Sequence, residues 1–280
     1  MLKLRDGIVE LYKKVATSIP PDVEDAIKKG LSSEEDSRAK ESLSRILDNI
    51  GASRQAPRPS CADTGVPIFR VKVPRGLSHV EMRNTIREAT VVATQKIPLV
   101  PAAVDILTGE NSGDNTGTGF PIIYLEEVSD DTLTIDLMLR SAESEYFGRT
   151  YRLPLGDLQA ERDLEGVRKC VVDSVRKAGG RGCPPYTVGV GIGASQDQVS
   201  VLATHQLFRK IPDENPNPAI AELEQKILNE LNELGIGPMG VGGRTTALGV
   251  KIGVNHRHPE SYLVYVSLSC WANRRGRLIW

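Results

Sequence analysis

The sequence has few aromatic residues, no closely spaced pair of cysteines and no excess of charge of either sign. Aromatic residues make up 5% of the 280 residues, so the stacking surfaces that usually bind nucleic-acid bases are scarce. The 35 basic and 36 acidic residues nearly cancel, which argues against nucleic acid or an anionic membrane as a partner. No apolar run reaches membrane-spanning length, and the first seven residues do not resemble a secretory leader. We therefore expect a soluble, globular, cytoplasmic protein.

The four cysteines, at positions 61, 170, 183 and 270, are far apart in the sequence. The absence of a C-x-x-C pair argues against a zinc knuckle and against a thioredoxin-type redox site, and a reducing compartment disfavours structural disulfides. Cys170 lies beside the apolar stripe of a predicted helix, which favours a buried structural thiol. The other three stand at predicted strand or loop ends. Three thiolates from distant segments could hold a [4Fe-4S] cluster and leave one iron without a protein ligand.

The apolar spacing predicts a mixed α/β (α+β) fold with a helical lead-in over residues 1–50 and one compact unit over residues 51–280. Residues 32–35 resemble a helix start because serines precede acidic residues. Residues 121–125 and 133–139 are predicted to be paired strands joined by a turn at residues 129–131. Further helices are predicted at 78–95, 163–178, 196–208 and 219–234, and further strands at 66–73, 247–254 and 262–268.

A glycine-rich stretch over residues 179–195 has two competing interpretations. Gly189-x-Gly191-x-x-Ala194 fits the dinucleotide-binding fingerprint, but the nearest acidic residues that could hold a ribose lie in a proline-broken loop at 210–218. The plainer interpretation is that the glycines permit close packing of a helix on a strand. In the same stretch two prolines follow Cys183 and restrict the loop that carries its thiol.

Six short segments rich in cysteine, glycine and threonine follow one another along nearly the whole chain. They are Pro59–Gly65, Asn115–Gly117, Cys183–Gly193, Leu234–Gly240, Gly243–Leu248 and Cys270–Arg275. In these segments and their order, the chain resembles the class I, iron-sulfur-dependent fumarate hydratases and L-tartrate dehydratases, specifically the separately encoded alpha subunit.

The resemblance implies that Cys61, Cys183 and Cys270 hold a [4Fe-4S] cluster with one non-protein-ligated iron. That iron would bind the hydroxyl and a carboxylate of the substrate. Asp63 would transfer a proton or orient the hydroxyl, and His258 would contact the substrate.

The resemblance also implies substrate-binding roles for Asn115, Arg140 and Arg275, and a small 2-hydroxy dicarboxylate as substrate. The remaining catalytic residues would lie on a beta subunit, so we expect a hetero-oligomer. An iron-sulfur or metal-stabilised paralogue without catalytic activity is the alternative, and a dinucleotide-binding domain is a further one.

Three positions depart from the family pattern. Ala62 stands where members usually have glutamine, Val100 where they usually have arginine, and Glu143 where they have a glycine-rich loop before a Ser-Glu pair. An arginine that grips a carboxylate makes a bidentate, charge-assisted contact that valine cannot replace. We therefore expect a tartrate-like or alkyl-substituted 2-hydroxy dicarboxylate to be preferred over malate.

Overall fold

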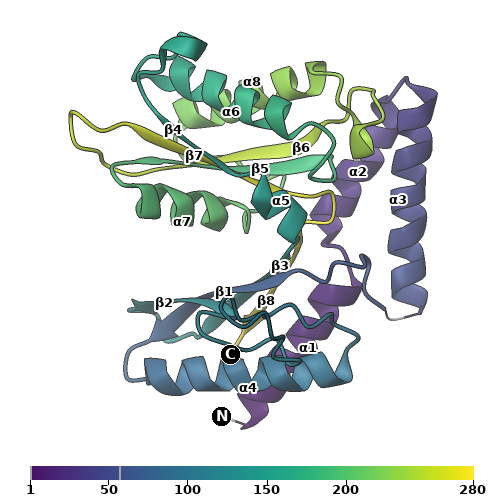
Figure 1. The fold of residues 1–280 in the computed structure, drawn as a ribbon, viewed down its shortest axis with the longest axis vertical. Coiled ribbons are helices and arrows are strands. Elements are labelled where there is room, and N and C mark those ends of the chain that lie inside the picture. The colour runs from purple at the N-terminus through teal and green to yellow at the C-terminus, as the bar shows by residue number, and fades with distance from the viewer. Residues whose placement is uncertain (1, 57) are drawn as a thin grey trace. The chain divides into compact units, whose positions relative to one another are not determined.

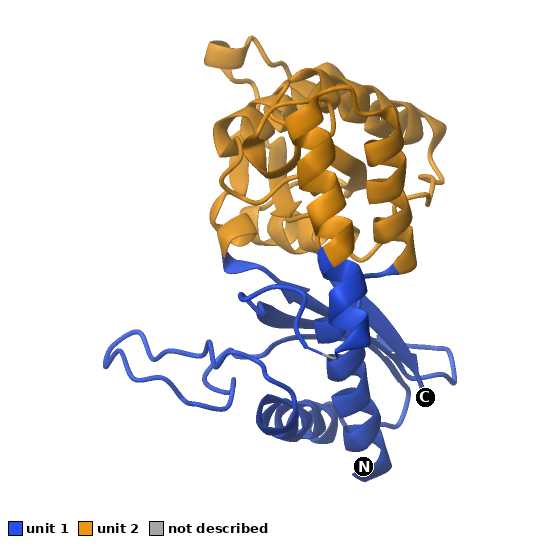
Figure 2. Ribbon diagram, turned by 90° about the vertical axis from the view of Figure 1, so that its right-hand side faces the viewer, with its two compact units in different colours: residues 1–20, 49–142, 274–280 blue, residues 21–48, 143–273 orange. Residues whose placement is uncertain are grey.

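The computed structural model describes residues 2–56 and 58–280 and contains two four-stranded sheets with helices packed on them (Figure 1). The predicted mixed α/β fold class is confirmed. The chain divides into two compact units (Figure 2): unit 1 comprises Met1–Pro20, Asn49–Ala142 and Arg274–Trp280, and unit 2 comprises Pro21–Asp48 and Glu143–Asn273. This grouping cuts across the predicted boundary at residue 50, because the helices of the N-terminal segment pack on different sheets.

Unit 1 is built on a mixed sheet in the order β2-β1-β3-β8. The strands are β1 Val66–Pro74, β2 Ile122–Val128, β3 Thr134–Arg140 and β8 Arg274–Ile279. Helices α1 (Leu2–Thr17) and α4 (His79–Lys96) bury their apolar sides against one face of this sheet, which carries Phe69, Leu137 and Leu139. Ser78 caps helix α4 as predicted, since its side chain accepts a hydrogen bond from the backbone N–H of Glu81.

The prediction that residues 121–125 and 133–139 pair with each other is wrong. Strand β1 lies between β2 and β3, parallel to β2 and antiparallel to β3. The physical reason is burial: β1 has apolar residues on both faces and takes a central position, whereas β2 is at best half-buried along its length and lies at the edge of the sheet. The burial gained by pairing β1 with both β2 and β3 therefore outweighed the advantage of pairing β2 with β3 through their short connection.

Unit 2 is built on a second mixed sheet in the order β4-β7-β5-β6. Its strands are β4 Arg149–Arg152, β5 Tyr186–Gly193, β6 Ala247–Val254 and β7 Leu263–Ser269. Helices α6 (Leu164–Ala178) and α8 (Pro218–Glu233) cover one face and α7 (Gln196–Gln206) covers the other (Figure 1). The remaining helices are α2 Pro21–Ser33, α3 Ser37–Gln55 and the short α5 Ala142–Tyr146, and two 3₁₀ turns lie at Gly156–Leu158 and Pro238–Gly240.

The glycines of β5 serve close packing against α7. A Cβ atom at Gly189 would overlap the carbonyl oxygen of Ala203, and one at Gly191 would overlap that of Val199. Strand β6, the parallel neighbour of β5, ends at Val254 and is followed by Asn255 rather than by an acidic residue. The structure thus supports the packing interpretation over the dinucleotide fingerprint.

The predicted helix start at residues 32–35 is also wrong. Helix α2 continues to Ser33, and α3 begins at Ser37 after a short link. The cap of α3 is Asp36, whose Oδ1 accepts hydrogen bonds from the backbone N–H groups of Arg38 at 2.9 Å and Ala39 at 3.1 Å. Among residues 2–56 and 58–280, no helix combines the length and apolar character needed to cross a membrane.

Candidate functional site

In unit 1, the loop that carries Cys61 is anchored at the residue before it. The backbone N–H of Ser60 donates to the carbonyl of Ala16 at 3.2 Å, and the side chain of Asn49 donates to the carbonyl of Ser60 at 2.7 Å. Ser60 is buried, whereas Cys61 is half-buried and the next residue, Ala62, is exposed. The anchoring therefore holds the Cys61 thiol at the surface of unit 1 on a backbone fixed from two sides.

Asp63 ties the start of β1 to the end of β3. Its Oδ1 accepts a hydrogen bond from the backbone N–H of Gly65 at 2.8 Å, and its Oδ2 accepts one from that of Ala142 at 3.0 Å. The carbonyl of Asp63 accepts a hydrogen bond from Arg274 Nη2 at 2.8 Å. Gly65 is required here because its φ is +87° and a Cβ would lie 2.8 Å from the carbonyl oxygen of Arg140. The carboxylate thus has a positioning role that the sequence did not predict.

Asn115 is also brought to this end of the unit 1 sheet. It is buried with φ of +60°, its Oδ1 accepts from the backbone N–H of Ala102 at 2.7 Å, and its Nδ2 donates to the carbonyl of Val100 at 3.2 Å. The backbone N–H of Val100 in turn donates to Thr64 Oγ1 at 2.9 Å. The segment of Asn115 is therefore joined by one hydrogen bond to the loop that carries Cys61 and Asp63.

Arg140 and Arg275 lie at the same end of this sheet and on the same face. Met138 of β3 stands opposite Arg275 of β8, and Arg140 is two residues further along β3, so the period of two puts all three side chains on one face. Helices α1 and α4 occupy the other face. Arg140 is 2% exposed and Arg275 half-buried. Unit 1 thus collects Cys61, Asp63, Asn115, Arg140 and Arg275 at one sheet end.

In unit 2, Cys183 lies in a constrained loop just before β5. Its φ is +58°, a left-handed conformation that costs a non-glycine residue about 1–3 kcal/mol and that clusters at functional sites. The thiol lies 3.4 Å from Glu143 Oε2, to which it donates a hydrogen bond. The backbone N–H of Met239 donates to the carbonyl of Pro184 at 2.7 Å, which joins this loop to the Leu234–Gly240 segment.

Cys270 follows β7 and meets the Cys183 loop. The backbone N–H of Trp271 donates to the carbonyl of Cys183 at 3.0 Å, so the two cysteine segments are directly hydrogen bonded. The buried Tyr186 lies close enough to both cysteines to respond to their charge. Burial raises the pKa of Tyr186 to about 12, and the hydrogen bond from the backbone N–H of Gly182 opposes this rise. Negative charge at Cys183 and Cys270 raises the pKa further. Unit 2 therefore places two of the three predicted cluster ligands side by side at one end of its sheet.

Cys170 behaves differently from the other cysteines. It is fully buried on α6 within the apolar core of unit 2. Burial, and to a smaller extent the charge of Asp173, raises the pKa of its thiol to about 12. A thiolate is therefore strongly disfavoured at this position, and the predicted burial of the Cys170 thiol is confirmed.

His258 does not lie with the cysteines of unit 2. It is exposed in the loop between β6 and β7, where its Nδ1 accepts a hydrogen bond from the backbone N–H of Glu260 at 3.1 Å. The pairs Thr187–Ser269 and Gly193–Leu263 mark the two ends of the β5–β7 ladder, so His258 and Cys270 are separated by roughly 20 Å of strand. The role of His258 stays a prediction from the resemblance, and the geometry of unit 2 does not support it.

Two acidic residues near the predicted site segments were not singled out as site residues from the sequence. Glu143 accepts from the Cys183 thiol, as described above. Glu34, from the link after α2, accepts hydrogen bonds from the backbone N–H groups of Arg244 and Thr245 and from Thr245 Oγ1, each at 2.9 Å. It thereby holds the glycine-rich loop over residues 237–245. No local pattern in the sequence indicated either contact, because the partners are more than 30 residues away.

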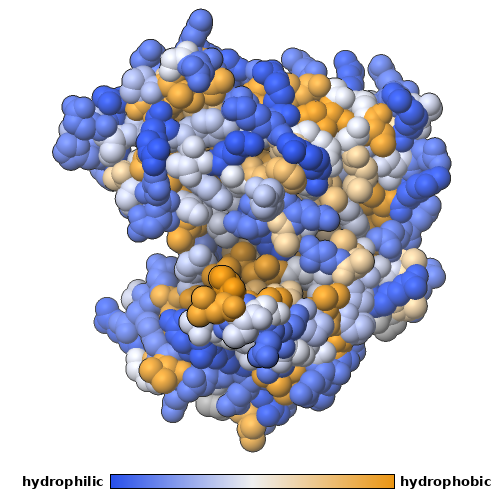
Figure 3. All heavy atoms as spheres, in the orientation of Figure 1, coloured by the Kyte–Doolittle hydropathy of each residue, from blue (hydrophilic) through white to orange (hydrophobic). Residues whose placement is uncertain are grey.

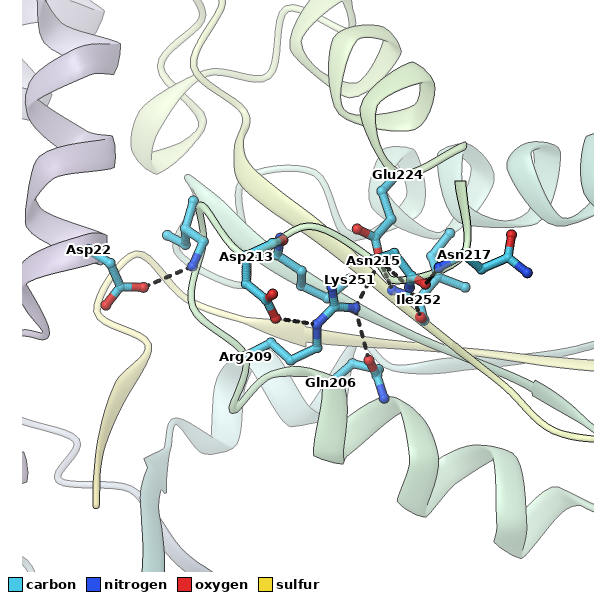
Figure 4. A network of polar contacts seen from close by, with 10 residues as sticks. Asp22, Gln206, Arg209, Asp213, Asn215, Asn217, Glu224, Lys251 and Ile252 are labelled. Carbon is cyan, nitrogen blue, oxygen red and sulfur yellow. Dashed lines mark hydrogen bonds and ion pairs between the residues drawn. The ribbon is translucent and has the colours of Figure 1, made fainter. Parts of the chain in front are cut away.

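A cavity of about 1250 Å³ in unit 2 is bounded by α2, α8, β6 and the 210–214 loop. Beside it, Glu224 Oε1 accepts hydrogen bonds from Arg209, from Asn215 and from the backbone N–H of Ile252, which belongs to the edge strand β6 (Figure 4). Lys251 is 4% exposed and donates to the carbonyl of Asp213. No predicted site residue is among the described residues that line this cavity, and the polar network closes the edge of the sheet.

Within the described residues, no group of three or more histidine, cysteine, aspartate or glutamate side chains is arranged to hold a metal ion. The four cysteines, all in the described part, form no disulfide. The fit of a cluster is therefore judged from the donors: the loops that carry Cys183 and Cys270 are hydrogen bonded to each other in unit 2, and Cys61 lies on an anchored loop of unit 1. Soft thiolate donors of this kind are the ligands of iron-sulfur clusters.

The model of the family described as "Fumarate hydratase (Fumerase)" matches residues 5–278. The chain belongs to this fumarate hydratase family. The resemblance inferred from the six segments is thereby confirmed.

Three curated relatives show how the fumarate hydratase family is divided among chains. A Geobacillus stearothermophilus protein provisionally named fumarate hydratase class I is 42% identical over 279 residues, covering 98% of this chain and 54% of the relative. A Methanocaldococcus jannaschii protein provisionally named L(+)-tartrate dehydratase subunit alpha is 35% identical over 280 residues, covering 98% of this chain and 96% of the relative. The L(+)-tartrate dehydratase subunit alpha of Escherichia coli K12 is 34% identical, covering 99% of this chain and 90% of the relative. The chain thus spans about half of the first relative and nearly all of the two alpha subunits.

Proposed function

We propose that this chain is the alpha subunit of an iron-sulfur hydro-lyase that adds or removes water on a 2-hydroxy dicarboxylate. The observation that carries the proposal is the pairing of Cys183 and Cys270 in hydrogen-bonded loops, while Cys170 is buried in the core with a raised pKa. Cys61, Cys183 and Cys270 would be the ligands. When bound, a [4Fe-4S] cluster with one iron free of protein ligands supplies a Lewis acid for the substrate's hydroxyl and a carboxylate.

The side chains at the end of the unit 1 sheet suit the rest of this chemistry. Arg140 and Arg275 provide guanidinium groups for the carboxylates of a dicarboxylate. Asp63, held by two backbone donors, presents a fixed carboxylate that orients the hydroxyl or moves a proton. Asn115 is positioned by its own hydrogen bonds and adds an amide beside them. The predicted role of His258 is not needed for these steps.

The substrate preference follows from Val100 and Ala62. Val100 is half exposed, and its backbone N–H is held by Thr64 Oγ1, so position 100 itself offers an aliphatic side chain where an arginine would offer a guanidinium. The loss of one such contact costs roughly 1.5–3 kcal/mol, or about one to two decades in binding. We infer that a tartrate-like or alkyl-substituted 2-hydroxy dicarboxylate is preferred over malate.

The proposed enzyme acts with a beta subunit. The relatives named as alpha subunits match the length of this chain, and the single-chain relative is almost twice as long. A second polypeptide would supply the missing half of the site and the remaining catalytic groups. A cytoplasmic hetero-oligomer is the assembly we infer.

The decisive test is iron content after anaerobic purification. We expect about four iron atoms per chain, a lower content in Cys61→Ala, Cys183→Ala and Cys270→Ala, and an unchanged content in the matched control Cys170→Ala. A colourless chain with one tightly held zinc would contradict the proposal and favour a structural metal site. The substrate preference is tested by measuring kcat/KM for malate, L-tartrate and methyl-substituted analogues with a beta subunit added. A kcat/KM for malate near 10⁸ M⁻¹s⁻¹, about the diffusional ceiling, would contradict the inferred preference.

A further inference from the structure

A narrow hairpin over residues 100–113 extends from unit 1 between α4 and β2. Val104 and Asn111 form an isolated antiparallel bridge, and the backbone N–H of Asp105 donates to the carbonyl of Glu110 at 2.8 Å. Figure 2 shows a long loop of unit 1 reaching away from its sheet. Since its two arms are hydrogen bonded to each other, the outer part of the hairpin, which is exposed over residues 104–112, is held by its own backbone.

The tip of this hairpin is apolar. Ile106 is 97% exposed, Leu107 is 95% exposed and Val104 is 53% exposed. Asp105 Oδ1 accepts hydrogen bonds from the backbone N–H groups of Leu107 and Thr108, both at 2.9 Å, which fixes the turn. Figure 3 shows strongly hydrophobic residues on the face of unit 1 turned towards the viewer. Single exposed apolar residues are ordinary, but two adjacent aliphatic side chains on a preformed tip indicate a contact surface.

The charge of the hairpin indicates the partner it fits. Between Ile97 and Phe120 the sequence contains Asp105, Glu110 and Asp114 and no lysine or arginine. An apolar tip with acidic neighbours is complementary to an apolar pocket rimmed by basic side chains, because opposite potentials steer the two surfaces together.

The base of the hairpin shares residues with the candidate site. The backbone N–H of Val100 donates to Thr64, next to Asp63, and Asn115 accepts from Ala102. A subunit that completes this site has to approach this end of unit 1, and the hairpin stands there. We propose that Ile106 and Leu107 insert into an apolar pocket with a lysine or arginine rim on the beta subunit. This inference rests on the proposed function, which requires that subunit.

The test is the affinity of the Ile106→Ser/Leu107→Ser variant for the beta subunit, measured with full-length chains. Because both aliphatic side chains would lose their burial in the partner's pocket, we expect about 100-fold weaker binding. The melting temperature and iron content should stay unchanged, since both side chains are exposed, and kcat at saturating beta subunit should match that of the unmodified protein. Glu110→Lys should slow association most strongly at low salt.

The matched control is Leu77→Ser/Val80→Ser, which removes two exposed apolar side chains, 46% and 68% exposed, at the other end of β1. It should bind the beta subunit as the unmodified chain does. Equal weakening by both double variants, or an affinity within threefold for Ile106→Ser/Leu107→Ser, would overturn the inference. So would self-association of the chain alone that the hairpin variant abolishes, because the occupant would then be a second copy. Failure of the proposed function would show separately, as a chain that loads no iron.

Discussion

Replacing Glu34 tests whether one buried carboxylate holds the glycine-rich loop of unit 2. Glu34 is 3% exposed, and its two oxygens accept from Arg244, from Thr245 and from the backbone N–H of Glu35 at 3.1 Å. Glu34→Ala leaves the buried backbone N–H and the hydroxyl of Thr245 without acceptors, at about 1–3 kcal/mol each. We expect a loss of about 3–5 kcal/mol in the free energy of unfolding of unit 2 for Glu34→Ala. Glu34→Gln keeps one acceptor and should lose about half of that.

The measurement is urea denaturation followed by the fluorescence of Trp271, which is buried in unit 2, in a background where Trp280 of unit 1 is replaced by phenylalanine. This choice isolates the transition of unit 2, so that separate unfolding of the two units does not blur the result. Glu35→Gln is the matched control, because the Glu35 side chain is 82% exposed. A Glu34→Gln variant as stable as this control would refute the role assigned to Glu34.

The same variant has a defined pH dependence. Burial alone would raise the pKa of Glu34, but the hydrogen bonds from Arg244, Thr245 and Glu35 outweigh it and hold the pKa below the ordinary value of 4.5. The ionised form therefore contributes stability that is complete above pH 4.5 and is lost as the pH falls through the lower pKa of the folded state. The difference between the unmodified protein and Glu34→Gln should be constant near pH 7 and should shrink below about pH 4.5. A difference that grows on acidification would contradict the argument.

Two further substitutions test the packing of each unit. Gly191→Ala should lower the free energy of unfolding by about 1–3 kcal/mol or more, since its Cβ would overlap the carbonyl oxygen of Val199. The control is Gly249→Ala in the same urea assay, because the added Cβ would lie 3.5 Å from the nearest side chain. In unit 1, Asp136→Asn removes a buried carboxylate that lies 2.6 and 2.8 Å from two arginines, and we expect about 1–3 kcal/mol of destabilisation because both arginines are partly solvated. Unchanged stability in either variant would disprove the corresponding contact.

The features that the sequence determined are those that depend on neighbours along the chain. Helix α4 begins directly after Ser78 because the serine side chain accepts a hydrogen bond from the backbone N–H of Glu81, three residues later. Cys170 was separated from the other cysteines by the apolar spacing around it, and its burial follows from that spacing. The order of the six glycine- and cysteine-rich segments was sufficient to indicate the family.

The features that only the tertiary structure decided depend on contacts between distant segments. Strand β1 separates β2 from β3 because its largely buried side chains, Ile68, Phe69, Val71 and Val73 among them, gain most in the centre of a sheet, whatever the connection length. Glu34 reads locally as part of a helix start, yet its carboxylate binds backbone groups about 210 residues away. His258 and Cys270 are close in sequence, but β7 runs between them and carries them to opposite ends of the sheet. Sequence spacing specifies local geometry, whereas burial and hydrogen bonding across the fold decide which distant residues meet.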